Sequence, residues 1–152
     1  MKDFFSNDIL IAAFVAWVMA QIVKVPLEYL RTREWNWALL LSTGGMPSSH
    51  SALVSAMAHG VGLREGFDSA LFAIGFVITA IVVYDATGIR RQAGLHAELI
   101  NAFISDLAAG HPIKDAQQKQ LKEILGHTPL QALGGIVWGV AFAWGFWMWG
   151  GK

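Results

Sequence analysis

Hydrophobic residues gather into four runs along the chain, separated by polar segments. A membrane-crossing helix needs about 20 apolar residues at a rise of about 1.5 Å per residue, and only the last run reaches that length unaided. The pattern predicts an all-α protein, an integral membrane bundle of about four short membrane-embedded helices. The runs are Ile9–Val23 with an amphipathic continuation to Leu30, Pro47–Leu63, Ser69–Tyr84 and Pro129–Trp149.

One long polar section, residues 85–127, lies between the third and fourth runs. Its apolar residues recur at helical spacing, which predicts an amphipathic helix on the core or on the membrane interface. Gly110 and Pro112 interrupt that helix, and Lys119–Leu125 is predicted to form a second, shorter one. The residues at helical spacing are Leu95, Leu99, Ile100, Phe103, Ile104 and Leu107.

The composition agrees with a membrane protein of one domain, residues 1–152. Apolar residues make up 55% of the chain and charged residues 14%, whereas soluble domains carry about 25% charged residues. Trp35 and Trp37, between the first two runs, suit an anchor at the membrane interface. The formal net charge of zero indicates no nucleic-acid partner, and the lack of cysteine excludes disulfides and a cysteine nucleophile.

Alternating membrane crossings would place several polar residues on one side. If all four runs cross, the ends of the first and third runs share a membrane face with the starts of the second and fourth. Sequence-distant residues are therefore expected to meet there, although ordinary polar loops would also give such a distribution. The residues on that side are Lys24, Arg31, Ser48, Ser49, His50, Arg90, Arg91 and His127.

The stretch "GGMPSSH", residues 44–50, combines a tight turn with a helix start. Pro47 suits the first helical turn, and the N–H groups that follow lie at the positive end of the helix dipole, where phosphate binds well. Ser48 and Ser49 could cap the helix or donate to a ligand oxygen. His50 could act as a general acid toward a leaving alkoxide. An ordinary helix cap would explain one serine but not the histidine.

Two pairs of cations could hold a phosphate group. Lys24 and Arg31 are seven residues apart, or two helical turns, and would share one helix face. Arg90 and Arg91 carry guanidinium groups, whose forked donors match phosphate oxygens. The alternative is that these side chains reach toward lipid headgroups and anchor the protein on its positively charged side.

A second histidine stands at the entrance of the fourth run. His127 precedes Pro129, and Gln131 follows the histidine by one helical turn, so its amide could reach the imidazole. A histidine held by an orienting group is the arrangement of a nucleophile. A lone histidine at a helix entrance is more often a cap or a surface residue, but the expected position of His127 beside His50 and the cations favours the catalytic interpretation instead.

These stretches resemble the motifs of a known family, the type 2 phosphatidic acid phosphatases, which are related to the vanadium haloperoxidases. Lys24 and Arg31 resemble the family motif K-x6-R-P, with Thr32 in place of the proline. "PSSH", from Pro47 to His50, is similar to P-S-G-H, with serine replacing glycine. The chain resembles the small divergent branch of that family over most of its length.

The third family motif, S-R-x5-H-x3-D, is split in this chain. Arg90 or Arg91 resembles its arginine. "HTPLQ", beginning at His127, resembles H-x3-D, with Gln131 where the family has an aspartate that orients the nucleophile. An amide stabilises an imidazolium less than a carboxylate does, so this departure predicts slow turnover.

Two further residues offer alternatives within this resemblance. Asp85 could supply the missing carboxylate, or it could cap a turn. His96 follows Arg90 at the spacing of the third motif. No acid or amide stands four residues after His96, and no glycine-bearing run follows it, so His127 is the preferred nucleophile.

The resemblance implies a lipid phosphate phosphatase that uses no metal and no cofactor. Lys24, Arg31 and one of the two later arginines would hold the phosphate, His127 would form a phosphohistidine, and His50 would protonate the leaving oxygen. Phosphatidic acid, phosphatidylglycerophosphate or a polyprenyl phosphate would be the substrate. The alternatives are a non-catalytic phospholipid-binding or scaffolding protein and, less favoured, a vanadate-dependent haloperoxidase.

The basic residues also predict an orientation. The membrane side that carries the motifs has more basic residues than the opposite side, which has Lys2, Arg64 and Lys152. This bias favours a cytoplasmic site in the cell membrane. A homo-oligomer is expected, because four short spans would leave polar surface to cover. The basic residues of the motif-bearing side are Lys24, Arg31, Arg33, Arg90, Arg91, Lys114, Lys119 and Lys122.

Overall fold

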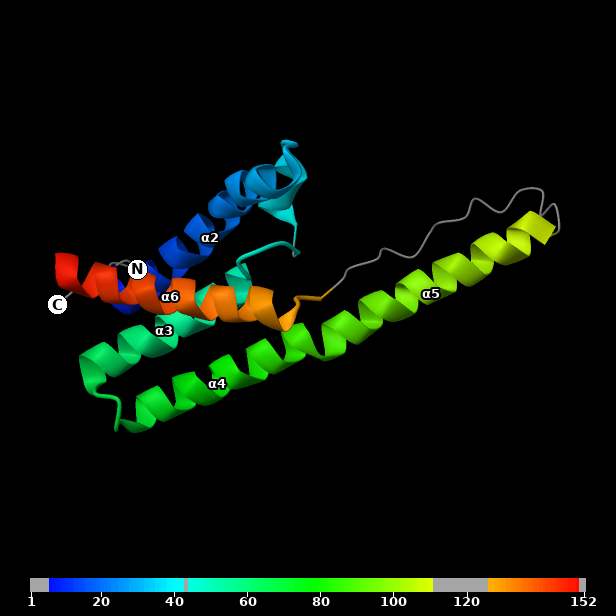
Figure 1. Ribbon diagram of the computed structural model, residues 1–152. Coiled ribbons are helices and arrows are strands. Elements are labelled where there is room, and N and C mark those ends of the chain that lie inside the picture. Colours follow the sequence, from blue (N-terminus) through cyan, green and yellow to red (C-terminus); the bar gives the residue numbers. More distant parts are fainter. Residues whose placement is uncertain (1–5, 43, 111–125, 151–152) are drawn as a thin grey trace.

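The chain folds into a bundle of helices, seen in a computed structural model that describes residues 6–42, 44–110 and 126–150 (Figure 1). Those ranges contain helices, turns and loops and no strand, which confirms the predicted all-α membrane bundle. The elements are α2 (Asp8–Thr32), η1 (Trp37–Leu41), α3 (Ser49–Glu65), α4 (Ala70–Thr87), α5 (Ile89–Gly110) and α6 (Pro129–Trp149).

Three helical stretches are long and apolar enough to cross a bilayer. They are Asp8–Thr32, Ala70–Asn101 and Pro129–Trp149. The expectation that only the fourth run had this length was therefore wrong: α2 passes through Pro26 without a break, and the third run continues from α4 into α5. These lengths remove the argument that short spans require a homo-oligomer.

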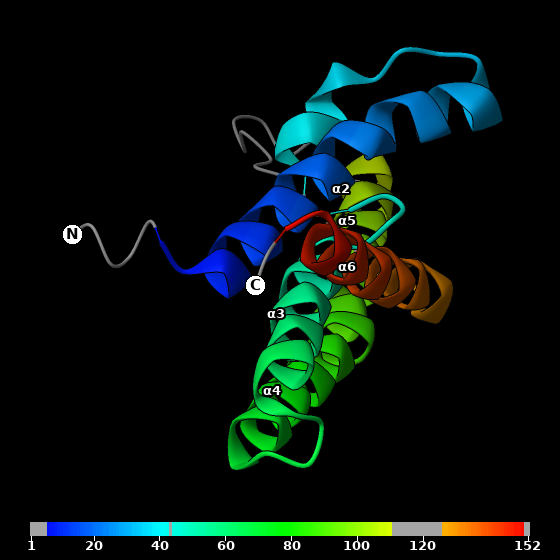
Figure 2. The same cartoon turned by 90° about the vertical axis from the view of Figure 1, so that its left-hand side faces the viewer.

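The remaining run, α3, lies at the centre of the bundle. It packs against α2, α4 and α6, and Figures 1 and 2 show it between α4 and the other two helices. Its buried positions are all small residues, and small residues let helix backbones approach closely inside a membrane. The buried residues of α3 are Ser49, Ser51, Ala52, Ser55, Ala56, Ala58, Gly60 and Gly62.

Glycines on the facing helices complete this close packing. A Cβ at Gly139 of α6 would collide with the carbonyl oxygen of Ala52, and a Cβ at Gly75 of α4 would lie 3.3 Å from Cα of Ala58. This packing explains why α3 is rich in small and weakly polar residues, because its buried side chains face other helices.

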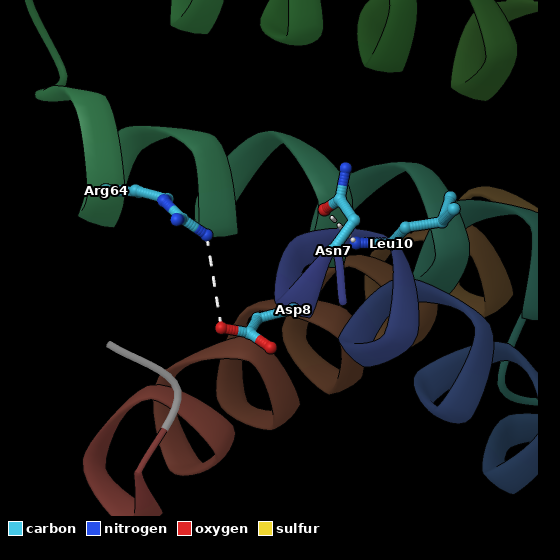
Figure 3. Close-up of polar contacts among 4 residues, drawn as sticks. All are labelled: Asn7, Asp8, Leu10 and Arg64. Atoms are coloured by element: carbon cyan, nitrogen blue, oxygen red, sulfur yellow. Dashed lines mark hydrogen bonds and ion pairs between the residues drawn. The ribbon is translucent and has the colours of Figure 1, made fainter. Parts of the chain in front are cut away.

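The two ends of the bundle differ in how their polar groups are arranged. At one end, Asn7 caps α2 by accepting a hydrogen bond from Leu10 N–H at 3.0 Å, and Arg64 lies 3.9 Å from Asp8 (Figure 3). Both charged side chains are about 40% exposed, at 42% and 38%. An exposed ion pair of this kind contributes little to stability. The other end holds the candidate site.

Aromatic rings cover the loop between α2 and η1. Trp35 stacks between Tyr29 and Trp37, with ring centroids 4.4 and 5.5 Å away. Both tryptophans are more than half exposed. This exposed stack is the arrangement expected of an anchor at the membrane interface.

The polar section begins as the predicted amphipathic helix. α5 runs from Ile89 to Gly110, and Leu99 and Ile100 are exposed on it. The second predicted helix, Lys119–Leu125, lies outside the described residues, as do Pro112 and the three lysines at positions 114, 119 and 122.

Candidate functional site

Two helix N-termini and one helix C-terminus meet at the site. The Ser48 N–H at the start of α3 donates to the carbonyl oxygen of Gln131 in α6 at 3.0 Å. The His127 N–H, just before α6, donates to the carbonyl oxygen of Ala86 in the last turn of α4, also at 3.0 Å. Gly135 makes the first contact possible, because a Cβ there would collide with the Ser48 carbonyl oxygen.

The two predicted histidines face each other across this junction. The ring centroids of His50 and His127 are 6.4 Å apart, and the rings are inclined at 55°. His127 is buried, with 4% of its surface exposed, whereas His50 is exposed. Residues 77 positions apart in the chain therefore present a shielded imidazole and an accessible one to the same region.

A capping box fixes the residues behind His127. The Gln131 N–H donates to Thr128 Oγ1 at 3.3 Å, and the Thr128 N–H donates to Gln131 Oε1 at 3.0 Å. These reciprocal bonds satisfy two backbone donors that a helix start would otherwise leave unpaired. Oε1 also lies 3.4 Å from His127 Nδ1. The amide thus reaches the imidazole, as the one-turn spacing predicted.

The start of α3 carries a buried serine cap. Ser48 Oγ accepts hydrogen bonds from the Ser51 N–H at 3.3 Å and from the Ser51 hydroxyl at 3.0 Å. Ser48 and Ser49 are both buried. Pro47 precedes this cap, and α3 begins at Ser49, so the expectation of proline in the first helical turn was wrong by two positions. The positive end of the helix dipole still points toward the histidine pair.

Lys24 lies beneath the loop that leads into α3. Its side chain is 1% exposed, and Nζ donates to the Ser42 carbonyl oxygen at 3.3 Å. Gly45 has φ +84°, a conformation that favours glycine, and a Cβ there would lie 3.5 Å from Lys24 Cδ. Arg31, two turns further along α2, is exposed. The two cations predicted as a pair therefore occupy different environments.

Gln21 is a polar residue of this region that sequence reasoning missed. Its Nε2 donates to the carbonyl oxygens of Leu40 and Ser42 at 3.0 and 3.4 Å, which ties the loop to α2. It thereby shares the Ser42 acceptor with Lys24. An amide three residues before a lysine inside an apolar run was the signal that could have identified it. Thr128 was also missed, although T-x-x-Q is a capping-box pattern.

The remaining predicted residues lie around the α4–α5 junction. Arg90 and Arg91 are in the first turn of α5, and their side chains are outside the described part of the structure. Asp85 immediately precedes Ala86, whose carbonyl group binds the His127 N–H. His96 is exposed on α5 and lines a shallow groove with Tyr84, Gly88, Ile89, Gln92 and Ala93.

Of the two candidate nucleophiles, His127 has its ring near that of His50, whereas His96 lines the groove on α5. Within residues 6–42, 44–110 and 126–150, no cluster of three or more histidine or acidic side chains could hold a metal ion. The polar groups that do meet are the two imidazoles, the Gln131 amide and the start of α3, while the buried ammonium of Lys24 lies beneath the loop that leads into α3. Together they can hold an anion and move a proton next to it.

Comparison with known proteins identifies the family of the chain. A family model described as "Divergent PAP2 family" matches residues 5–142. Over 146 residues the chain is 40% identical to "Uncharacterized membrane protein YuiD" of Bacillus subtilis (strain 168), which covers 91% of this chain and 92% of that protein. No solved structure matches the chain. The match spans nearly the whole bundle and every residue of the site, and the chain therefore belongs to the divergent PAP2 family.

Proposed function

We propose that this membrane protein is a lipid phosphate phosphatase that works through a phosphohistidine intermediate. The observation that carries the proposal is the 6.4 Å separation of the His50 and His127 rings, with Gln131 behind His127. Reacting atoms approach to about 3–3.5 Å, and a proton donor lies about 2.9 Å from its acceptor. A phosphoryl group between the two rings could therefore touch both.

The proposed reaction has two steps. His127 Nε2 attacks phosphorus, the N–P bond forms, the P–O bond to the lipid alcohol breaks, and His50 gives its proton to the leaving oxygen. A water molecule then attacks phosphorus, the N–P bond breaks, and His50 takes the proton from that water. The products are the alcohol and inorganic phosphate, and both histidines return to their starting states.

Positive charge near the phosphate would stabilise the transition state. The start of α3 offers the helix dipole, and Lys24, held against Ser42, offers an ammonium group with two further donors. Arg31 and one of Arg90 and Arg91 are proposed to supply guanidinium groups. Such donors act on the equatorial oxygens, where charge accumulates during phosphoryl transfer.

A lipid substrate fits the position of the site. His127 lies just before α6, one of the helices that can cross a bilayer, so a phosphate headgroup at the interface would reach it while its acyl or prenyl chain stays among lipids. We propose that the site lies on the cytoplasmic face of the cell membrane, because four crossings would put more basic residues on the motif-bearing side than on the other.

The test is phosphate release from detergent-solubilised phosphatidic acid in the presence of a metal chelator. His127→Ala should abolish release, His50→Ala should lower it by about 10²–10⁴-fold, and His96→Ala, the matched control, should retain it. Loss confined to His96→Ala, or a requirement for a divalent metal, would overturn the proposal. Tight binding of the lipid without turnover would identify a non-catalytic phospholipid-binding protein instead.

Substrates with different leaving groups distinguish the roles of the two histidines. An aryl phosphate with an acidic phenol releases its phenolate without protonation, so in His50→Ala the first step, measured as the burst of phenol, should be slowed much less than the first step on phosphatidic acid. His127→Ala should be inactive on both. Equal losses for the two variants on both substrates would contradict the assignment of acid and nucleophile.

A further inference from the structure

The capping box at the start of α6 has a consequence for the imidazole beside it. Gln131 Oε1 lies 3.0 Å from the Thr128 backbone nitrogen and 3.4 Å from His127 Nδ1. We infer that Thr128 is a positioning residue: its N–H holds the Gln131 amide with the oxygen toward His127, which keeps the imidazole proton on Nδ1 and the lone pair on Nε2. The inference rests on the proposed function, since it concerns the nitrogen that attacks phosphorus.

The direction of the amide follows from the donor that it meets. A backbone N–H can only donate, so the Gln131 atom that faces Thr128 is the carbonyl oxygen and not the NH₂ group. The same oxygen is the atom next to His127 Nδ1, and because it can only accept, Nδ1 carries the hydrogen. A neutral imidazole has one N–H, which leaves the lone pair on Nε2.

The rest of the local structure holds this arrangement in place. The Gln131 N–H is bound to Thr128 Oγ1, and the His127 N–H is bound to the carbonyl oxygen of Ala86 in α4. Backbone bonds therefore fix both ends of the His127–Gln131 segment. His127 Nε2 is buried. At 3.4 Å the bond to Nδ1 is long, as catalytic hydrogen bonds often are before substrate binds.

Without the Thr128 N–H, nothing in the capping box would distinguish the two ends of the amide. Rotation by half a turn would present the NH₂ group to Nδ1, which would then accept, and the proton would move to Nε2. A protonated Nε2 cannot attack phosphorus. The N–H of a helix cap would in this way decide whether the nucleophile is available.

The direct test is nitrogen NMR of the full-length protein in detergent micelles, with ¹⁵N-labelled histidine and His127→Ala to assign the signals. The wild-type protein should show the hydrogen of His127 on Nδ1. Thr128→Pro removes the N–H, and the cap angles of φ −69° and ψ 154° suit proline. In that variant the proton should be shared between the two nitrogens, while Thr128→Ala, which loses only the hydroxyl, should keep it on Nδ1.

Turnover should follow the tautomer. Thr128→Pro should lower kcat by between about 10- and 10⁴-fold, the larger value being the loss when a catalytic imidazole is held wholly in the wrong tautomer. KM should stay unchanged, because phosphate binding does not use this residue. A merely structural weakening of the helix would instead change the thermal midpoint without moving the proton.

A rescue variant makes the test independent of helix stability. In Gln131→Glu both carboxylate oxygens accept, so no N–H is needed to choose between them. Thr128→Pro combined with Gln131→Glu should therefore keep the proton on Nδ1. If Thr128→Pro alone does not fold, Gln131→Met, which removes the acceptor at similar length, must lose the Nδ1 preference.

Three results would overturn the inference: a wild-type proton on Nε2, a Thr128→Pro variant with the wild-type tautomer, or a double variant whose proton is shared between the two nitrogens as in Thr128→Pro. None of these measurements needs turnover. A protein with the expected tautomers but no phosphatase activity would therefore refute the proposed function and leave the role of Thr128 intact.

Discussion

The two helices that begin at the site use the same kinds of residue in opposite order. Pro47 and the cap Ser48 precede α3, which carries His50 inside its first turn. His127 and the cap Thr128 precede α6, which carries Pro129 at its first position. The cap of α3 is buried and its histidine exposed, whereas the cap of α6 is exposed and its histidine buried.

This reversal separates two chemical roles. His50 lies on the positive end of a helix and is open to solvent, so it can exchange a proton between the two steps of the proposed reaction. His127 precedes its helix and is held through its backbone by Ala86 and through its ring by Gln131. A fixed, shielded imidazole suits a nucleophile, which depends on orientation more than on proton exchange.

The largest effect is expected from separating the two helix starts. Gly135→Ala would press a methyl group against the Ser48 carbonyl oxygen. That methyl carbon would also lie 2.8 Å from Ser51 Cβ. Overpacking of this kind costs about 1–3 kcal/mol, and the shift would also move His50 away from His127, so phosphatase activity should be lost. Thermal unfolding in detergent and phosphate release measure the two effects.

Gly145→Ala is the matched control in the same helix. A Cβ at Gly145 meets nothing within 4 Å, so both the thermal midpoint and the activity should stay at the wild-type value. Full activity in Gly135→Ala would show that the close approach of α3 and α6 is not needed for the site.

The next effect concerns Lys24, the buried cation beneath the loop that leads into α3. Lys24→Met keeps the buried stem and removes the ammonium group. If Lys24 stabilises the transition state, kcat/KM should fall by about 10²–10³-fold, whereas stability should hold or rise, because a buried charge costs desolvation. Steady-state kinetics and thermal unfolding on the same preparation would separate these opposite trends.

Arg31→Met sharpens that prediction. Arg31 is exposed, so its removal should reduce activity less than removal of Lys24 if it only approaches the phosphate from the rim. An equal or greater loss in Arg31→Met would mean that the exposed guanidinium, and not the buried ammonium, is the main phosphate ligand.

Much of the fold followed from the sequence, because each helix start has its own local signal. The run starting at Ser69 begins one residue before α4 (Ala70), and the run at Pro129 begins where α6 does. The first run was predicted to continue to Leu30, near the observed end of α2 at Thr32, but only its apolar part had been counted toward a membrane span. The sequence did not show that α3 lies at the centre of the bundle, because hydropathy reports how apolar a segment is and not which helices it packs against.

The site was predicted less completely, for a different physical reason. Sequence spacing predicted that Gln131 reaches His127, although the capping box and not a shared helical turn brings them together, because His127 lies before α6 begins. It could not foresee the bonds from Ser48 to Gln131 or from His127 to Ala86, because these depend on how three helix ends pack. The amide of Gln21 was overlooked for the same reason, as its partners lie 19 and 21 residues away.

A smaller effect should distinguish the two caps. Ser48→Ala removes an acceptor used by both the N–H and the hydroxyl of Ser51 in a buried position, and leaving a buried hydroxyl without its partner costs about 1–3 kcal/mol. Thr128→Ala removes an exposed cap and should cost about 0.5–1 kcal/mol. Denaturant or thermal unfolding of both variants would rank them, and the opposite ranking would mean that burial does not set the strength of these caps.

The smallest effect is expected at the far end of α3, where Arg64 lies 3.9 Å from Asp8. An exposed ion pair contributes about 0–1 kcal/mol, so Arg64→Gln and Asp8→Asn should each leave the thermal midpoint nearly unchanged and phosphate release at the wild-type rate. The double variant should behave as the sum of the single ones in a thermodynamic cycle. A marked loss of activity in either variant would mean that the two ends of α3 are coupled. In that case the proposed chemistry would depend on the exposed end of α3 as well as on its buried start.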